Sequence, residues 1–136
     1  MLKSYEISGT DFSVAGEASS SFKMLLKKLG VKPEIVRKVS IAMYEAEINT
    51  VVHGGGGQCE AEVLGDCIKV VFRDQGPGIA NVELAMKEGF STASEKIREL
   101  GFGAGMGLPN IKRYTDEMKI KTEVGKGTQI EFIVYL

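Results

Sequence analysis

The stretch Asp74-Gln75-Gly76-Pro77-Gly78-Ile79 is the most informative part of this chain, because an acidic residue stands directly before a glycine-rich turn. Two other stretches give it meaning. One is Glu45-Ala46-Glu47-Ile48-Asn49, on a predicted helix, and the other is Gly101-Phe102-Gly103-Ala104-Gly105-Met106-Gly107-Leu108. An acidic turn, a Glu/Asn pair four residues apart and a glycine-rich loop opening a helix together indicate an adenine nucleotide site with a metal ion.

The composition is that of one globular domain spanning residues 1–136. Of these residues, 43% are hydrophobic and 26% are charged, which suits a single hydrophobic core. The net charge of −1 gives no basic surface for nucleic acid. No uncharged run is long enough to span a bilayer, and the N-terminus does not resemble a signal peptide. We therefore expect a cytoplasmic protein without nucleic-acid or membrane partners.

The two cysteines, Cys59 and Cys67, are expected to be reduced packing residues. If Gly65-Asp66 is a two-residue hairpin turn, Leu64 pairs with Cys67, Val63 with Ile68 and Cys59 with Phe72. The two thiols then lie far apart along the ladder. Two cysteines and a single histidine also argue against a structural zinc site.

Periodicity places the remaining elements. Apolar residues at helical spacing predict a helix over residues 17–29, and Pro33 begins a second helix that ends near His53. The run Gly54–Gly57 is predicted to be a flexible, non-helical connection. The other expected elements are strands over 3–8, 12–14, 60–64, 68–74, 118–124 and 128–136, a short helix over 81–88, a mobile loop over 89–103, and a helix from 105 to 114 or 115.

This order of elements predicts the fold class. Helices come first, followed by strands with one inserted helix. Such an order favours an α+β two-layer sandwich, in which a mixed, mainly antiparallel sheet is covered on one face by helices.

Asp74 is expected on the core-facing side of its strand. Because side chains alternate across a strand, Asp74 shares a face with Ile68, Val70 and Phe72. Thr128 begins a second core-facing row, so both polar groups would lie at the rim of one pocket. A carboxylate in that position needs a partner or a ligand. The alternative is that Asp74 only caps the following turn.

Glu45 and Asn49 share one helix face, since they are four residues apart. The amide oxygen of Asn49 can ligate Mg²⁺, and the Glu45 carboxylate can accept a proton from an attacking hydroxyl or water. The alternative is a solvated face with a Glu–Asn hydrogen bond. Glu47 points elsewhere by its spacing and is expected to be exposed. His53 is expected to bond locally at the helix end.

The glycines between residues 101 and 107 can bring backbone N–H groups close to an anion, with a helix N-terminus behind them. The spacing matches neither a P-loop nor a Rossmann fingerprint. The alternative is a loop that is merely flexible.

Taken together, these motifs resemble the Bergerat-type ATP-binding (GHKL) fold shared by gyrase, heat-shock chaperone, histidine kinase and mismatch-repair ATPases. Residues 45–49 resemble the N box, 74–78 the first glycine box, 103–108 the second, and Gly127-Thr128 the terminal glycine-threonine element. Within that superfamily the chain is similar to the small bacterial serine/threonine kinases that regulate sigma factors, nearest the stressosome switch kinases.

The resemblance implies a role for each matching residue. Glu45 would be the general base, Asn49 would hold Mg²⁺, and Asp74 would bind the adenine amino group with support from Thr128 through water. Residues 89–100 would form an ATP lid. The implied nucleotide-binding residues are Asn49, Asp74, Gly76, Gly78, Ile79, Gly103, Ala104, Gly105, Met106, Gly107, Leu108 and Thr128.

The resemblance also implies ATP and Mg²⁺ as cofactors and a serine or threonine of a STAS-domain antagonist protein as substrate. A sigma factor or a phosphatase would be a further partner, and the chain would form a homodimer. The alternative is a nucleotide-dependent module that sequesters a sigma factor or another regulator with little phosphoryl transfer. Retention of Glu45 favours the kinase, because a pure binder needs only Asp74, the glycines and Asn49. A third alternative is a detached catalytic domain of a histidine kinase.

Overall fold

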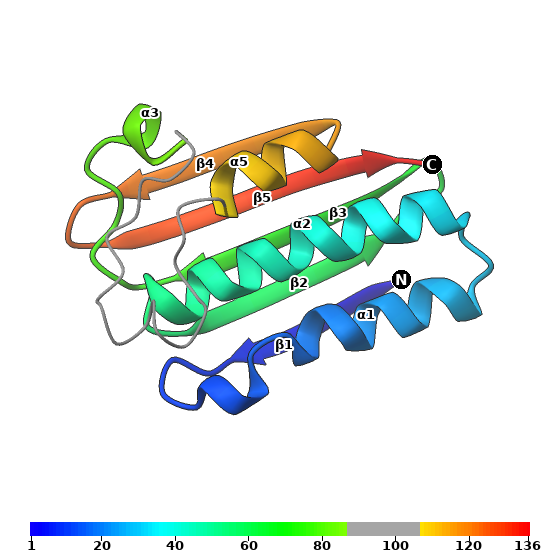
Figure 1. Ribbon diagram of the computed structural model, residues 1–136, viewed down its shortest axis with the longest axis horizontal. Coiled ribbons are helices and arrows are strands. Elements are labelled where there is room, and N and C mark those ends of the chain that lie inside the picture. Colours follow the sequence, from blue (N-terminus) through cyan, green and yellow to red (C-terminus); the bar gives the residue numbers. More distant parts are fainter. Residues whose placement is uncertain (87–106) are drawn as a thin grey trace.

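The computed structural model describes residues 1–86 and 107–136 and shows a two-layer α+β sandwich (Figure 1). Five strands form one sheet in the order β1-β2-β3-β5-β4, and each neighbouring pair in this order is antiparallel. The long helices α1, α2 and α5 lie against the same face of the sheet (Figure 1). The predicted fold class is confirmed.

The strands are β1 Leu2–Ile7, β2 Gly57–Val63, β3 Cys67–Asp74, β4 Glu117–Glu123 and β5 Gly127–Tyr135. The helices are α1 Glu17–Lys28, α2 Pro33–Val52, α3 Val82–Ala85 and α5 Gly107–Tyr114, with a 3₁₀ helix, η1, at Phe12–Val14. Within the described ranges, no helix is both long and apolar enough to cross a bilayer.

Glycine and proline set the boundary between the first two long helices. Gly30 has a φ of 76°, and its N–H donates to the carbonyl of Lys27 at 3.1 Å. The next N–H, that of Val31, donates to the carbonyl of Leu26 at 3.1 Å. This pair of bonds satisfies the last carbonyls of α1, and the left-handed backbone at Gly30 redirects the chain. Pro33 then occupies the first turn of α2, where a missing N–H costs nothing.

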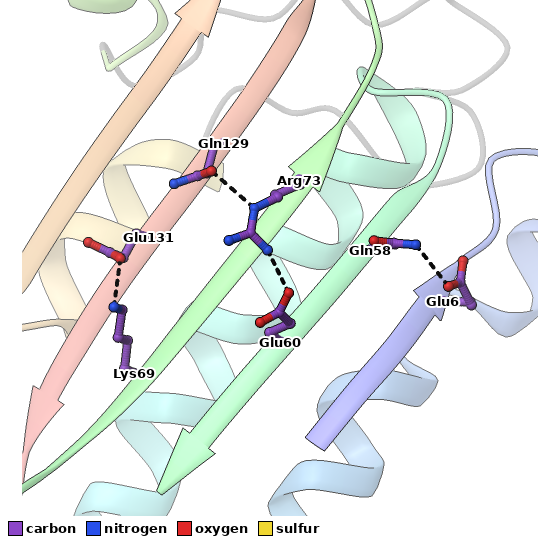
Figure 2. Close-up of polar contacts among 7 residues, drawn as sticks. All are labelled: Glu6, Gln58, Glu60, Lys69, Arg73, Gln129 and Glu131. Atoms are coloured by element: carbon purple, nitrogen blue, oxygen red, sulfur yellow. Dashed lines mark hydrogen bonds and ion pairs between the residues drawn. The ribbon is translucent and has the colours of Figure 1, made fainter. Parts of the chain in front are cut away.

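The core lies between the sheet and the helices. The side chains of Phe72 on β3 and Phe132 on β5 are buried beneath α1 and α2, which contribute Phe22, Leu26 and Met43. The opposite face of the sheet is polar. Arg73 pairs with Glu60 at 2.8 Å and Lys69 with Glu131 at 3.3 Å across neighbouring strands (Figure 2). The core therefore has one side only, and the helices cover it.

The predicted β2–β3 hairpin is confirmed in its register. Val63 pairs with Ile68 and Cys59 with Phe72, and Leu64 N–H donates to the carbonyl of Cys67 at 2.9 Å. Cys59 and Cys67 are both buried and unbridged. Burial raises the pKa of the Cys59 thiol above its ordinary range, so this cysteine stays protonated.

Two details of the predicted secondary structure were wrong: the type of one element and the start of one strand. The strand expected over residues 12–14 is η1, because the Asp11 carboxylate accepts from the Ser13 N–H at 3.0 Å and closes a tight turn there. Strand β2 begins at Gly57, so the last residue of the predicted connection is paired with Asp74. The short helix expected over 81–88 is α3, capped by Asn81. The loop expected over 89–103 lies outside the described residues.

The burial of Phe132 gives a stability prediction. Phe132→Ala should lower the free energy of unfolding by about 3–5 kcal/mol, because it leaves a cavity between the sheet and the helices. Ile133→Ala is the matched control, since Ile133 is the next residue on β5 and is half-buried on the opposite face. Urea denaturation measures both. Equal losses in the two variants would contradict the assignment of the core to the helical side.

Candidate functional site

The predicted site residues gather at one end of the sheet. The C-terminal half of α2 carries Glu45 and Asn49, β3 ends at Asp74, and β5 begins beside Thr128. These ends lie together on the left of Figure 1, and the first turn of α5 lies above α2. The fold therefore brings the described residues of the three sequence motifs to one region.

Asp74 is half-buried, and its carboxylate joins two elements. Its Oδ1 accepts from the Gly76 N–H at 2.9 Å and from the Thr128 N–H at 3.2 Å. Asp74 therefore does cap the turn after β3, as the alternative interpretation predicted, because the first of these bonds closes that turn. The second bond ties the same oxygen to β5. Both bonds fall on Oδ1, while Oδ2 lies against Gly54.

The four-glycine run after α2 is held in close backbone contacts. A Cβ added at Gly54 would lie 2.5 Å from Asp74 Cγ, and one added at Gly76 would lie 2.8 Å from the Cα of Gly54. A Cβ on Gly57 would lie 2.0 Å from the carbonyl oxygen of Arg73. These distances are far inside van der Waals contact. The run is non-helical as predicted, and packing requires a glycine at Gly54, beside Asp74, and at Gly57, beside Arg73.

Gly78 and Ile79 bind β4 to the turn. Gly78 has a φ of 77°, and a Cβ there would lie 2.4 Å from the Glu123 carbonyl oxygen. The Ile79 N–H donates to Thr122 Oγ1 at 2.8 Å, and that hydroxyl lies 3.0 Å from Thr128 Oγ1. Sequence reasoning missed Thr122. Its position on the core-facing side of β4, directly opposite Thr128, was the available signal.

Glu45 lies beside the start of α5. A Cβ added at Gly107 would be 3.5 Å from Glu45 Oε2, so the carboxylate lies close to the first residue of α5. Burial raises the pKa of Glu45, and a hydrogen bond with the Asn110 side chain partly opposes this shift. Asn110 was not predicted, and nothing in the sequence distinguished it. The side chain of Leu108 faces the core.

Asn49 lies in the last turn of α2, and His53 is the residue that caps its C-terminus. Asn49 is half-buried, and its carbonyl accepts from the N–H of His53 at 2.9 Å and of Gly54 at 3.2 Å. Burial lowers the pKa of the His53 imidazole, and the negative charge of Asp74 opposes that shift. The backbone bond of His53 agrees with the predicted local role. The predicted residues Gly103, Ala104, Gly105 and Met106 and the predicted lid lie outside the described residues.

The prediction that Glu47 is exposed was wrong. Its side chain is 2% exposed and accepts from the N–H groups of Gly16 at 2.9 Å, Ala18 at 3.2 Å and Ser19 at 2.9 Å. The Ser19 hydroxyl donates to the same carboxylate. The N-terminus of α1 offers unpaired N–H donors and the positive end of the helix dipole. A carboxylate is therefore well accommodated there.

Comparison with known proteins places this chain in a family. The profile of the histidine kinase-like ATPase domain matches residues 11–134, and the chain belongs to that family. It is 33% identical to the serine/threonine-protein kinase RsbT of Bacillus subtilis (strain 168) over 114 residues, which cover 81% of this chain and 80% of RsbT. It is 31% identical to an anti-sigma F factor of Thermoanaerobacter sp. (strain X514), covering 76% of this chain and 72% of that protein.

Solved structures support the fold alone. The mycobacterial sensor histidine kinase MprB superposes with a TM-score of 0.56 at 14% identity, over 99% of this chain and 97% of that one. A chain of the SiaB-SiaC complex from Pseudomonas aeruginosa superposes with a TM-score of 0.59 at 12% identity, over 98% and 89%.

The contact between Gly54 and Asp74 gives a prediction. Gly54→Ala should push the Asp74 carboxylate out of place and weaken ADP binding by about tenfold or more, equivalent to about 1.4 kcal/mol. Gly65→Ala is the control, because a Cβ there meets nothing within 4 Å. Isothermal titration with ADP measures both variants. Unchanged affinity in Gly54→Ala would show that nucleotide binding does not depend on the position of Asp74.

Proposed function

We propose that this protein is an ATP-dependent serine/threonine kinase of the anti-sigma regulatory type. It transfers the γ-phosphate of ATP to a serine or threonine of a STAS-like antagonist protein. The observation that carries the proposal is the position of the Glu45 carboxylate. It projects from α2, is half-buried next to Gly107 at the start of α5, and has a raised pKa. The similarity to RsbT, a serine/threonine-protein kinase, supports it.

The residues present fit a magnesium nucleotide. Asp74 provides an acceptor oxygen for the adenine amino group, and Asn49 provides a hard amide oxygen for Mg²⁺ from the same face of α2 as Glu45. When bound, Mg²⁺ supplies positive charge that offsets the charge of the phosphates. Gly107, at the N-terminus of α5, belongs to the proposed phosphate-binding loop.

In the proposed reaction, the acceptor hydroxyl oxygen forms a bond to the γ-phosphorus. The bond between that phosphorus and the β,γ-bridging oxygen breaks, and ADP leaves with the electron pair. Glu45 takes the proton of the hydroxyl. A carboxylate with a raised pKa is a stronger base than an exposed one, and this favours the transfer.

A second candidate function is a nucleotide-dependent module that sequesters a sigma factor or another regulator with little phosphoryl transfer. The similarity to anti-sigma F factors favours it. Incubation with γ-labelled ATP, Mg²⁺ and candidate STAS-domain proteins separates the two, since only the kinase labels the acceptor. The proposal also includes a cytoplasmic location, a phosphatase or sigma factor as further partner, and a homodimer.

Replacing Glu45 tests the base. Glu45→Ala should slow phosphoryl transfer by roughly 10²-fold or more while ADP affinity changes little. Glu34→Ala, at an exposed position in the first turn of α2, is the control. Because the pKa of Glu45 is raised, the wild-type rate should fall on acidification at a pH above the ordinary Glu pKa of 4.5. Unchanged turnover in Glu45→Ala would remove this role.

Base selectivity tests Asp74. ADP should bind roughly 10- to 100-fold tighter than GDP, because guanine presents an oxygen where adenine presents an amino donor. Asp74→Asn should weaken ADP binding sharply. Two backbone N–H groups donate to Oδ1, so the amide of the Asp74→Asn variant would keep its oxygen there. Its NH₂ group would then take the Oδ2 position and face the adenine amino group, which is also a donor. Calorimetric titration of both nucleotides is the measurement. Equal wild-type affinities for ADP and GDP would mean that Asp74 only caps its turn.

A further inference from the structure

Glu47 is a buried carboxylate that the proposed chemistry does not use. We propose that it is a positioning residue, whose bonds to the N-terminus of α1 fix the rotation of α2 and thereby aim Glu45 and Asn49 at the nucleotide. This inference rests on the proposed function, because it concerns the metal-binding and base residues of the same site.

The Glu47 contacts are directional and come from one segment. Oε2 accepts from the N–H groups of Gly16 and Ala18, and Oε1 accepts from the N–H and the hydroxyl of Ser19. Hydrogen bonds weaken steeply when they bend or lengthen. Four donors converging on two oxygens therefore hold this turn of α2 at one angle and one height relative to α1.

Glu47 lies on the opposite side of α2 from the site. It is two residues from Glu45 and two from Asn49, and each residue turns the helix by about 100°. Any rotation of α2 that pulls Glu47 from its donors moves both site residues by the same angle. A rotation of about 20° displaces atoms about 6 Å from the helix axis by about 2 Å. Misplacement of about 1 Å can cost a reaction 10²-fold.

The apolar contacts of this stretch of α2 do not set the rotation as strictly. Met43, Ala46 and Val51 of this stretch are buried in the core, but each dispersion contact that they make is individually weak. Hydrophobic burial is itself non-directional. The receiving segment has a defined conformation of its own, because Gly16 has a φ of 99° and a Cβ there would lie 3.1 Å from the Tyr44 ring. The Glu47 carboxylate therefore makes the most directional of the contacts that hold this stretch of α2.

The test compares three variants that should all fold. Glu47→Gln keeps the size of the side chain but places an NH₂ donor among N–H donors. Ser19→Ala removes only the hydroxyl donor and leaves the backbone N–H groups in place. Val39→Ala, a core truncation elsewhere on α2, is the control for lost stability. Each variant is titrated with ADP by calorimetry, with and without Mg²⁺, at a temperature where circular dichroism shows it folded.

Positioning and mere stabilisation predict different results. ADP affinity without Mg²⁺ depends on Asp74 of β3, so it should stay within about twofold of wild type in every variant. The gain in affinity on adding Mg²⁺ depends on Asn49 of α2. That gain should fall at least about fivefold in Glu47→Gln, fall less in Ser19→Ala, and remain in Val39→Ala. A merely structural role would lower the binding stoichiometry and leave the gain unchanged.

Two kinds of result would overturn the inference. If adding Mg²⁺ raises ADP affinity as much in Glu47→Gln and in Ser19→Ala as in wild type, the inference is overturned and the proposed function stands. The same holds if wild-type protein binds ADP but Mg²⁺ does not raise its affinity. Wild-type protein that binds no ADP would overturn the proposed function and the inference with it. If Glu47→Gln does not fold, Ser19→Ala decides, because it changes a single donor.

Discussion

The close approach of backbone around Asp74 is the constraint on which the site depends. Three chain segments meet there at close range: the run after α2, the turn after β3 and the start of β5. Gly54, Gly76 and Gly127 each stand where a Cβ would overlap a neighbouring segment. The contact brings the end of α2 against the strand that carries Asp74. The spacing between Asn49 and Asp74, the residues proposed to hold the metal and the adenine, follows from it.

Sequence reasoning succeeded where one short-range rule fixed the geometry. The two-residue turn at Gly65-Asp66 sets the register of the β2–β3 hairpin. Strand alternation predicts that Asp74 and Thr128 both lie on the core-facing side, and the structure pairs them directly across β3 and β5. It failed where the deciding partner came from a distant part of the chain. The position of Glu47 relative to Glu45 and Asn49 along the helix predicts a side chain that faces solvent. The tertiary fold places the N-terminus of α1 against this side chain instead.

The glycine-rich motifs show why a motif match and a structural role must be separated. Gly76 and Gly78 were assigned to nucleotide binding, yet both are already required by contacts within the protein. Similarly, residues 12–14 have the composition of a strand, but local bonding from Asp11 gives a turn. Backbone sterics of this kind depend on which segments meet, and an isolated sequence does not give that. The residues from 103 to 106 lie outside the part of the chain that the structure describes.

The pairing of β1 has a consequence for the order of folding. Among the described strands, β1 pairs with β2 alone, so Leu2 meets Glu62 and Ile7 meets Gly57 after two intervening helices. During synthesis, the first strand is made long before its partner leaves the ribosome. Closing a loop of that length costs conformational entropy before the β1–β2 contacts form, and this slows the search. Helices α1 and α2, which contact each other locally, can form beforehand, and the first segment of the chain is therefore among the last to find its place.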